Sequence, residues 1–228
     1  MRRKIFIFLI VSSLAFAALD QTYVQDVSRE GTSEITKSTD ITLFAAGLDE
    51  DVFDSIKEVC DTDAELVCSI EDKTITMTER FSPGVHYSFE ADYGFPSITY
   101  TFTLKKVATD RFAASLDRLL LKAGAIDELG GAVPPIDLGD RETNLEGAAL
   151  LRQLKANITY VVNMPTDISE ASAGTVDGSS VTLDVASLME KSEPVTVRCT
   201  ELNMAFLIVI GAVIVLGALA LSFVIQKK

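Results

Sequence analysis

The chain has no tryptophan and a single histidine, His86, among its 228 residues. A Ser-His-Asp triad would need a serine and an acid to converge on that one histidine, and the nucleophile motif Gly-x-Ser-x-Gly does not occur. The sequence also lacks a phosphate-binding loop, a Gly-x-Gly-x-x-Gly motif and paired Cys-x-x-Cys units, which leaves nucleotide, dinucleotide and structural zinc sites unsupported. We therefore expect no enzymatic activity and no cofactor.

Cysteine is scarce as well, with only three in the chain. Cys60 and Cys68 are close in sequence, and we expect them to form a disulfide in an oxidising compartment. Catalytic dithiols usually have two intervening residues, so this spacing does not indicate redox catalysis. Cys199 is left over, and the sequence does not decide whether it pairs with one of the others, stays free or links two copies.

Basic residues are few: 20 lysines and arginines stand against 33 aspartates and glutamates, giving a net charge of −13. Five of the basic residues lie at the two ends (2–4 and 227–228), so the part between them carries 15 basic and 33 acidic residues, a net charge of −18. This balance disfavours nucleic acid and anionic lipid headgroups as partners. A solubilising surface is the simplest explanation of the acidity.

The first 18 residues have the layout of a secretory signal peptide. A basic start at Arg2, Arg3 and Lys4 precedes a short apolar run, and Ala15-Phe16-Ala17 supplies the small-x-small cleavage pattern. An uncleaved N-terminal anchor is the alternative. We therefore expect residues 19–203 to form an extracytoplasmic domain.

Residues 204–226 contain no charged residue and precede Lys227 and Lys228. As a helix, this stretch is roughly 33 Å long, which predicts a transmembrane helix. By the positive-inside rule, the tail at 227–228 is cytoplasmic. We thus expect a single-pass protein of the cell membrane with its N-terminal domain outside. Gly211, Ala218 and Ser222 share one helical face, where small residues favour self-association, so a homodimer is an open expectation.

Periodicity in the exported part predicts an α+β domain, in which an antiparallel sheet of short strands carries two or three packed helices. Within residues 97–104, apolar side chains at 98, 100, 102 and 104 alternate with threonines at 99, 101 and 103, the pattern of a strand with one covered face. Residues 124–143 are rich in glycine and proline and are expected to form a flexible loop. The predicted strands are 23–29, 33–44, 65–70, 74–78, 85–89, 97–104, 156–164, 180–185 and 195–199, and the predicted helices are 48–60, 110–123 and 144–154.

Two further motifs carry candidate chemistry. Asp61, Asp63 and Glu65 place carboxylates at alternate positions between two cysteines, where they would contribute oxygens to a calcium ion. The loop lacks the glycine and the closing acid of a twelve-residue calcium loop, so three solvated acids on a turn are the simpler interpretation. Asn157 begins an Asn-Ile-Thr glycosylation sequence, although it falls in a predicted strand.

The segment 156–185, with NITYVVNMP followed by GTVDGSSVTLDV, resembles the closing part of the LppM-type domain of envelope-anchored bacterial and archaeal proteins. The early hairpin around Glu30-Gly31, followed by a helix, fits the same pattern. This chain departs from the family in having Leu183 near the position of its usual tryptophan and no lipid-modified cysteine. The resemblance implies a small sheet-plus-helix domain presented at a membrane, with an apolar cavity for lipid or glycolipid.

Two functional classes remain. The first is a non-enzymatic, membrane-tethered binding module for a lipid, glycan or envelope protein at the outer membrane face. The second is a structural or assembly component of the cell envelope that self-associates through its anchor. A deep apolar cavity would favour the first, and a filled core with an exposed apolar patch or strand edge would favour the second.

Overall fold

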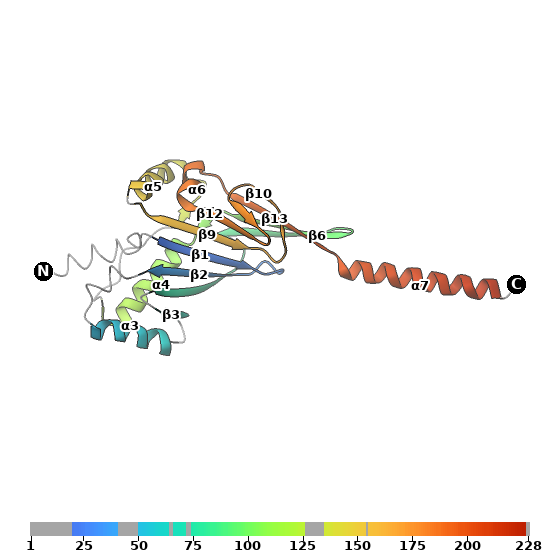
Figure 1. The fold of residues 1–228 in the computed structure, drawn as a ribbon, viewed down its shortest axis with the longest axis horizontal. Coiled ribbons are helices and arrows are strands. Elements are labelled where there is room, and N and C mark those ends of the chain that lie inside the picture. The colour runs from blue at the N-terminus through green and yellow to red at the C-terminus, as the bar shows by residue number, and fades with distance from the viewer. Residues whose placement is uncertain are drawn as a thin grey trace.

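A computed structural model shows a two-sheet α+β domain from which one helix projects (Figure 1). It describes residues 20–40, 50–63, 66–71, 74–125, 135–153 and 155–226, excluding the side chains of residues 20, 50, 52 and 219–226. The predicted signal peptide at 1–18, the tail at 227–228 and residues 126–134 of the predicted loop lie outside the described residues. The rest of that loop contains the short strand β8 (Ile136–Asp137) and the start of a helix at Arg141.

The larger sheet has seven strands in the order β11-β12-β9-β1-β2-β4-β3. β1 pairs with β2 in the antiparallel sense and with β9 in the parallel sense, so the N-terminal strand joins two hairpin systems that are far apart in sequence. The strands are β1 (Asp20–Val27), β2 (Ser33–Asp40), β3 (Cys68–Glu71), β4 (Thr74–Phe81), β9 (Asn157–Asn163), β11 (Thr175–Asp177) and β12 (Ser180–Asp184).

The second sheet has four strands in the order β10-β13-β6-β5, all antiparallel. β13 pairs with β6 along its whole length and leads into the projecting helix. The strands are β5 (Tyr87–Tyr93), β6 (Ser97–Leu104), β10 (Ile168–Ala171) and β13 (Val195–Leu202), and β7 (Lys106–Val107) pairs separately with β8.

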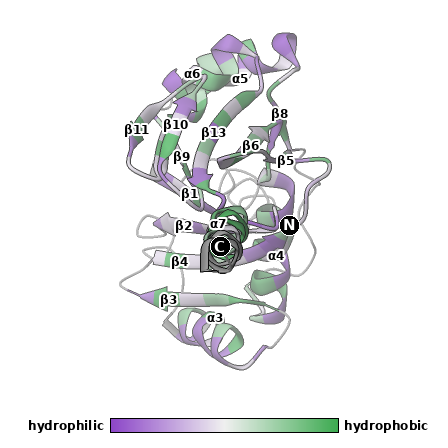
Figure 2. Cartoon of the chain, turned by 90° about the vertical axis from the view of Figure 1, so that its right-hand side faces the viewer, coloured by the Kyte–Doolittle hydropathy of each residue, from purple (hydrophilic) through white to green (hydrophobic). Residues whose placement is uncertain are grey.

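The described residues form five helices: α3 (Glu50–Thr62), α4 (Thr109–Lys122), α5 (Arg141–Gln153), α6 (Val185–Lys191) and α7 (Met204–Gln226). α3 packs on α4 and β3, and α4 reaches β4, whereas α5 and α6 pack on each other and α6 lies on β9 and β12. Figure 2, viewed along α7, shows α5 and α6 at one end of the sheets and α3 at the other. α7 leaves the domain on the side where β13 ends.

Three parts of the predicted fold class are wrong. The large sheet is mixed rather than antiparallel, because β1 and β9 run parallel. The predicted transmembrane helix is contradicted, since within the described residues no helix is both long enough and apolar enough to cross a membrane. The packed helices also exceed the expected two or three, because α6 follows directly after β12 where a strand end was predicted.

The core lies between the inner faces of the two sheets and the helices, as the period-two alternation dictates. Aromatic rings form its centre: the ring centroid of Tyr23 lies 5.5 Å from that of Phe112 on α4 and 5.8 Å from that of Tyr160 on β9. One charged side chain shares this interior. Lys37 of β2 is only 6% exposed, and its Nζ lies 5.4 Å from the centroid of the Tyr23 ring.

The outer face of the larger sheet carries many serine and threonine hydroxyl groups. Thr22 lies opposite Thr159 on β9 and Ser38 on β2, and Ser38 lies opposite Thr76 on β4. The Ser38 and Thr76 hydroxyl oxygens are 3.4 Å apart. Because threonine combines high strand propensity with a polar group, it suits a strand face that remains hydrated.

Candidate functional site

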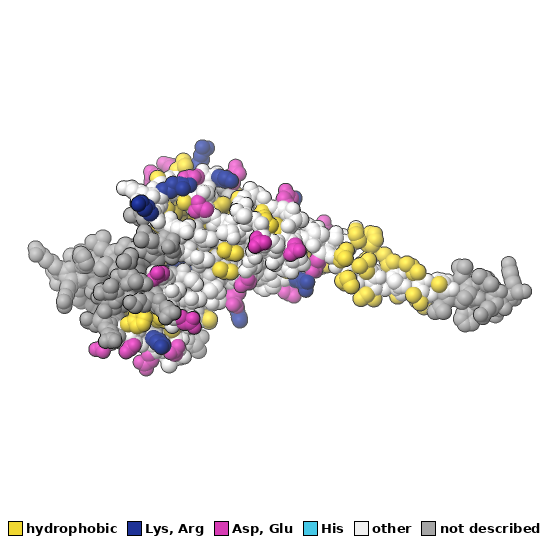
Figure 3. Space-filling model, in the orientation of Figure 1, with side chains coloured by type: hydrophobic (Ala, Val, Ile, Leu, Met, Phe, Trp, Pro, Cys, Tyr) yellow, Lys and Arg dark blue, Asp and Glu magenta, His cyan; other side chains and the backbone are white. Residues whose placement is uncertain are grey.

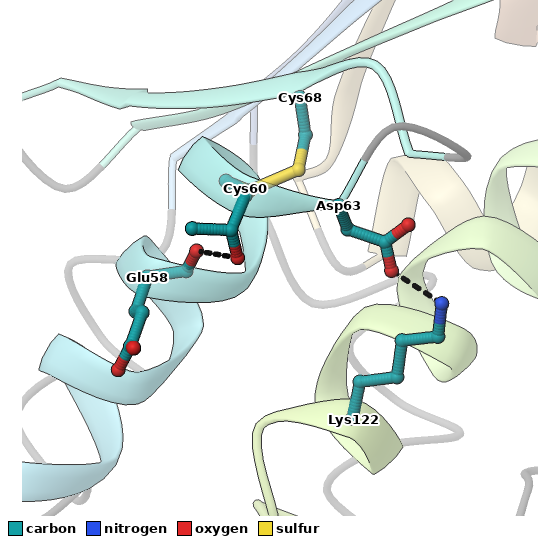
Figure 4. Close-up of a disulfide and its surroundings, with 6 residues drawn as sticks. Glu58, Cys60, Asp63, Cys68 and Lys122 are labelled. Atoms are coloured by element: carbon teal, nitrogen blue, oxygen red, sulfur yellow. Dashed lines mark hydrogen bonds and ion pairs between the residues drawn. A yellow bond between two sulfur atoms is a disulfide. The ribbon is translucent and has the colours of Figure 1, made fainter.

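The predicted cysteine pair lies at the junction of α3 and β3 (Figure 4). Cys60, in the last turn of α3, is joined to Cys68, the first residue of β3, by a disulfide. Close by, the Lys122 ammonium forms an ion pair with the Asp63 carboxylate, which ties the end of α4 to the loop after α3. The disulfide and the ion pair therefore fasten α3 to the rest of the domain.

The predicted calcium ligands do not come together in the described residues. Asp61 lies exposed in the last turn of α3, Asp63 is paired with Lys122, and Glu65 is outside the described residues. Within the part of the chain that is described, no group of three His, Cys, Asp or Glu side chains is placed to hold a metal ion. The one of the three carboxylates with a described partner, Asp63, therefore pairs with a lysine.

The single histidine is placed near an acid. His86 precedes β5, and its ring meets that of Phe81 edge-on with the centroids 5.2 Å apart. His86 Nδ1 and Asp110 Oδ1 are both buried without a hydrogen-bond partner among the described residues. Burial lowers the pKa of His86, although the negative charge of Asp110 acts to raise it. Neither described groove is lined by these two side chains, and the pair has no serine or cysteine positioned beside it by any described contact.

Two open surface grooves meet at Glu34 of β2 and Arg80 of β4, whose side chains pair at 3.4 Å. Their volumes are about 440 and 460 Å³. Both mix hydroxyl and carboxylate groups with apolar side chains. The first is lined by Glu34, Leu66, Val67, Cys68, Met77, Thr78, Glu79, Arg80 and Ser115, and the second by Asp26, Ser28, Thr32, Ser33, Glu34, Arg80, Phe81 and Ser82.

In contrast to the mixed grooves, helix α7 presents an apolar surface. Its large apolar side chains are between 37% and 67% exposed. Figure 3 shows these side chains gathered on the described part of α7, while acidic and basic side chains are scattered over the domain. The exposed residues of α7 are Met204, Phe206, Leu207, Ile208, Val209, Val213, Ile214, Val215 and Leu216.

The predicted small-residue face of α7 is described only in part. Gly211 and Ala218 are both exposed, and a Cβ added at Gly211 would meet nothing within 4 Å. The side chain of Ser222 is outside the described residues. Self-association through this face stays a prediction.

The remaining two residues singled out in the sequence, Cys199 and Asn157, both lie on strands. Cys199 is a free thiol on β13 that is fully buried, and burial raises its pKa. Its position leaves no surface through which it could link two copies without opening the domain. Asn157 is exposed at the first position of β9.

Sequence reasoning missed the hairpin tip between β5 and β6, which carries two of the most exposed aromatic residues of the described chain. Tyr93 is 70% exposed and Phe95 is 63% exposed. The Phe95 ring lies 4.8 Å, centroid to centroid, from that of Phe206 on α7. The only available signal was a pair of aromatics around Gly94 in a turn, where polar residues are the rule.

No protein-family model, no curated protein and no solved structure matches the chain. The resemblance to LppM-type domains therefore stays a prediction.

Proposed function

We propose that this chain is a non-catalytic binding module that associates with a membrane surface through its apolar C-terminal end. One observation carries the proposal: apolar side chains are exposed on every side of the described part of α7 (204–218), not along one stripe. The four consecutive residues Phe206 to Val209 are all exposed, and at about 100° per residue they point in all directions around the helix axis.

An all-round apolar surface favours lipid over a protein groove. A groove on a partner covers one stripe of a helix and leaves its other apolar sides in water, whereas a helix that enters the acyl chains from one face of the membrane, without crossing it, has lipid on several sides. Removing such a surface from water contributes roughly 25 cal/mol per Å² of apolar area. No charged side chain occurs between Met204 and Ile225 to oppose that transfer.

The disulfide and the polar surface of the domain support an extracytoplasmic location and a binding role. A Cys60–Cys68 bond is typical of an oxidising, extracytoplasmic compartment. The domain also offers a hydroxyl-lined sheet and two open grooves suited to a polar partner such as a glycan or another envelope protein. The two described grooves are open and mixed in character rather than deep and apolar, so the proposal does not rest on a lipid-filled cavity. An exposed apolar end was the feature expected of an assembly component, and we assign it to lipid because the apolar side chains surround the helix.

The test is co-flotation of the full chain with phosphatidylcholine vesicles on a density gradient. We expect the wild-type chain to float with the vesicles, and a variant with Ile208, Val213 and Leu216 changed to serine to lose most of that association. A matched control changes Val67 and Val85, which are 65% and 66% exposed on the domain, to serine and should float like the wild type. A wild-type chain that stays at the bottom of the gradient, or a triple variant that floats equally well, would refute the proposal.

A further inference from the structure

The junction between the domain and α7 is surrounded by exposed apolar side chains from three separate segments. The β5–β6 tip contributes two of them, the end of β13 one and the start of α7 two. We call this set the apolar collar; it consists of Tyr93, Phe95, Leu202, Met204 and Phe206, with exposures of 70%, 63%, 61%, 61% and 41%.

Asn203 holds the collar together as one unit. Its backbone N–H donates to the carbonyl oxygen of Pro96 at 2.9 Å, and its side-chain amide donates to the carbonyl oxygen of Gly94 at 3.3 Å. Its side-chain oxygen also accepts from the backbone N–H of Phe206 at 3.2 Å, the bond that caps the first turn of a helix. The hairpin tip and the start of α7 are therefore fixed to each other through one residue and through the Phe95–Phe206 ring contact.

The Glu201 carboxylate near the end of β13 is paired with Arg29 of the β1–β2 turn. Glu201 accepts a hydrogen bond from the Tyr100 hydroxyl at 2.7 Å and forms an ion pair with Arg29 at 2.8 Å. These two donors, Tyr100 first and then Arg29, hold the pKa of Glu201 below its usual value. The collar thus presents tyrosine, phenylalanine, leucine and methionine to its surroundings. The adjacent Glu201 carboxylate is paired, and the Asp92 carboxylate is exposed beside Tyr93.

From this arrangement we infer that the β5–β6 hairpin tip is a second lipid contact, which fixes how the domain faces the membrane. The inference rests on the proposed membrane association and adds to it. The collar is continuous with the apolar surface of α7, because Met204 and Phe206 belong to both. Lipid that contacts the start of α7 therefore also contacts the collar. Aromatic side chains with one polar end, such as tyrosine, favour the boundary between headgroups and acyl chains. With both α7 and the tip in contact with lipid, rotation of the domain about the junction is restricted.

The absence of tryptophan makes the inference directly testable, because each introduced tryptophan is the only one in the chain. The full chain with Phe95→Trp is added to phosphatidylcholine vesicles whose acyl chains carry bromine close to the headgroup, since bromine quenches tryptophan fluorescence on contact. Tyr93→Trp is a second reporter in case the ring contact at Phe95 does not tolerate indole. Val85→Trp is the matched control, because Val85 is equally exposed but precedes β5, at the strand end away from the tip.

We expect both tip reporters to lose most of their emission on brominated vesicles and the Val85→Trp chain to lose almost none. If the chain floats with vesicles while the tip reporters stay as bright as the control, the tip contact is refuted and the membrane association stands. Strong quenching of the control together with the tip would also refute it, because the domain would then lie on the membrane without a preferred end. If the chain does not float, the proposed function fails and the tip contact fails with it.

Discussion

Lys37 offers the sharpest test of the energetics of the core. It sits in the middle of β2, opposite Tyr23 on β1 and Met77 on β4, and burial lowers its pKa from 10.5 to about 8. That difference corresponds to roughly 3 kcal/mol of destabilisation by the charged form at neutral pH. Attraction between the ammonium and the face of the Tyr23 ring offsets about 1 kcal/mol of it. Lys37→Met keeps the length of the side chain and is expected to raise the free energy of unfolding by about 2 kcal/mol at pH 7.

The gain should depend on pH in a defined direction. Below pH 8 both the folded and the unfolded chain carry the Lys37 proton, so the wild type bears the full destabilisation. Between pH 8 and 10.5 the unfolded chain binds more protons than the folded one, so the free energy of unfolding of the wild type rises with pH. From pH 7 to pH 10 this contribution amounts to about 2.5 kcal/mol, and the methionine variant lacks it.

The measurement is guanidinium unfolding at pH 7 and pH 10, followed by circular dichroism in a mild detergent that covers α7. Lys57→Met on the exposed side of α3 is the control, and should change the free energy of unfolding by less than about 0.5 kcal/mol. The reasoning is refuted if Lys37→Met is no more stable than the wild type at pH 7. It is refuted equally if the variant keeps the same advantage at pH 10, because the destabilisation would then not come from the charge.

Two further predictions concern the backbone and the disulfide. Gly31→Ala should destabilise the domain by more than about 1 kcal/mol, because Gly31 has a φ of +83° and an added Cβ would lie 2.4 Å from a ring atom of the β5 phenylalanine. The melting temperature of this variant is compared with that of the control Gly84→Ala, where an added Cβ would meet nothing within 4 Å. Equal melting temperatures for the two variants would contradict the predicted destabilisation. Replacing Cys60 and Cys68 together by alanine should lower the free energy of unfolding by roughly 2–3 kcal/mol, since the bond closes a short loop. Denaturant titration with and without reductant measures this, and a reductant-insensitive wild type would argue against the bond.

The sequence patterns were informative wherever the structure is local. The alternation over 97–104 indicates β6 with its correct bounds. The amphipathic stripe of residues 110–123 indicates α4, whose apolar side packs into the core. In each case the pattern occupies a few consecutive residues and reports which side chains are covered, so it identifies the element without identifying the partner that covers it.

Pairing between distant segments was not predictable in the same way. β1 lies between β2 and β9, and its register with β9 joins residues more than a hundred positions apart. An alternating pattern identifies a strand with one covered face, but it does not distinguish a parallel from an antiparallel neighbour. α6 escaped detection for another reason: Asp184, the last residue of β12, is also the N-cap of the helix, so strand and helix follow without a turn.

The same distinction applies to the apolar end of the molecule. The apolar character of residues 204–226 can be recognised in the sequence, because these residues form one continuous segment. The collar is not, because Phe95 and Phe206 are brought together by the β6–β13 pairing, and Asn203 completes the junction by bonding across to the hairpin tip. Neither aromatic of the tip would attract notice alone, since single exposed apolar residues are normal on protein surfaces. Their location at a junction where exposed apolar residues from three segments meet is the basis of the shared role proposed for them. The proposed lipid contact thus depends on the fold as well as on apolar side chains, because the Asn203 side chain bonds both to the hairpin tip and to the start of α7.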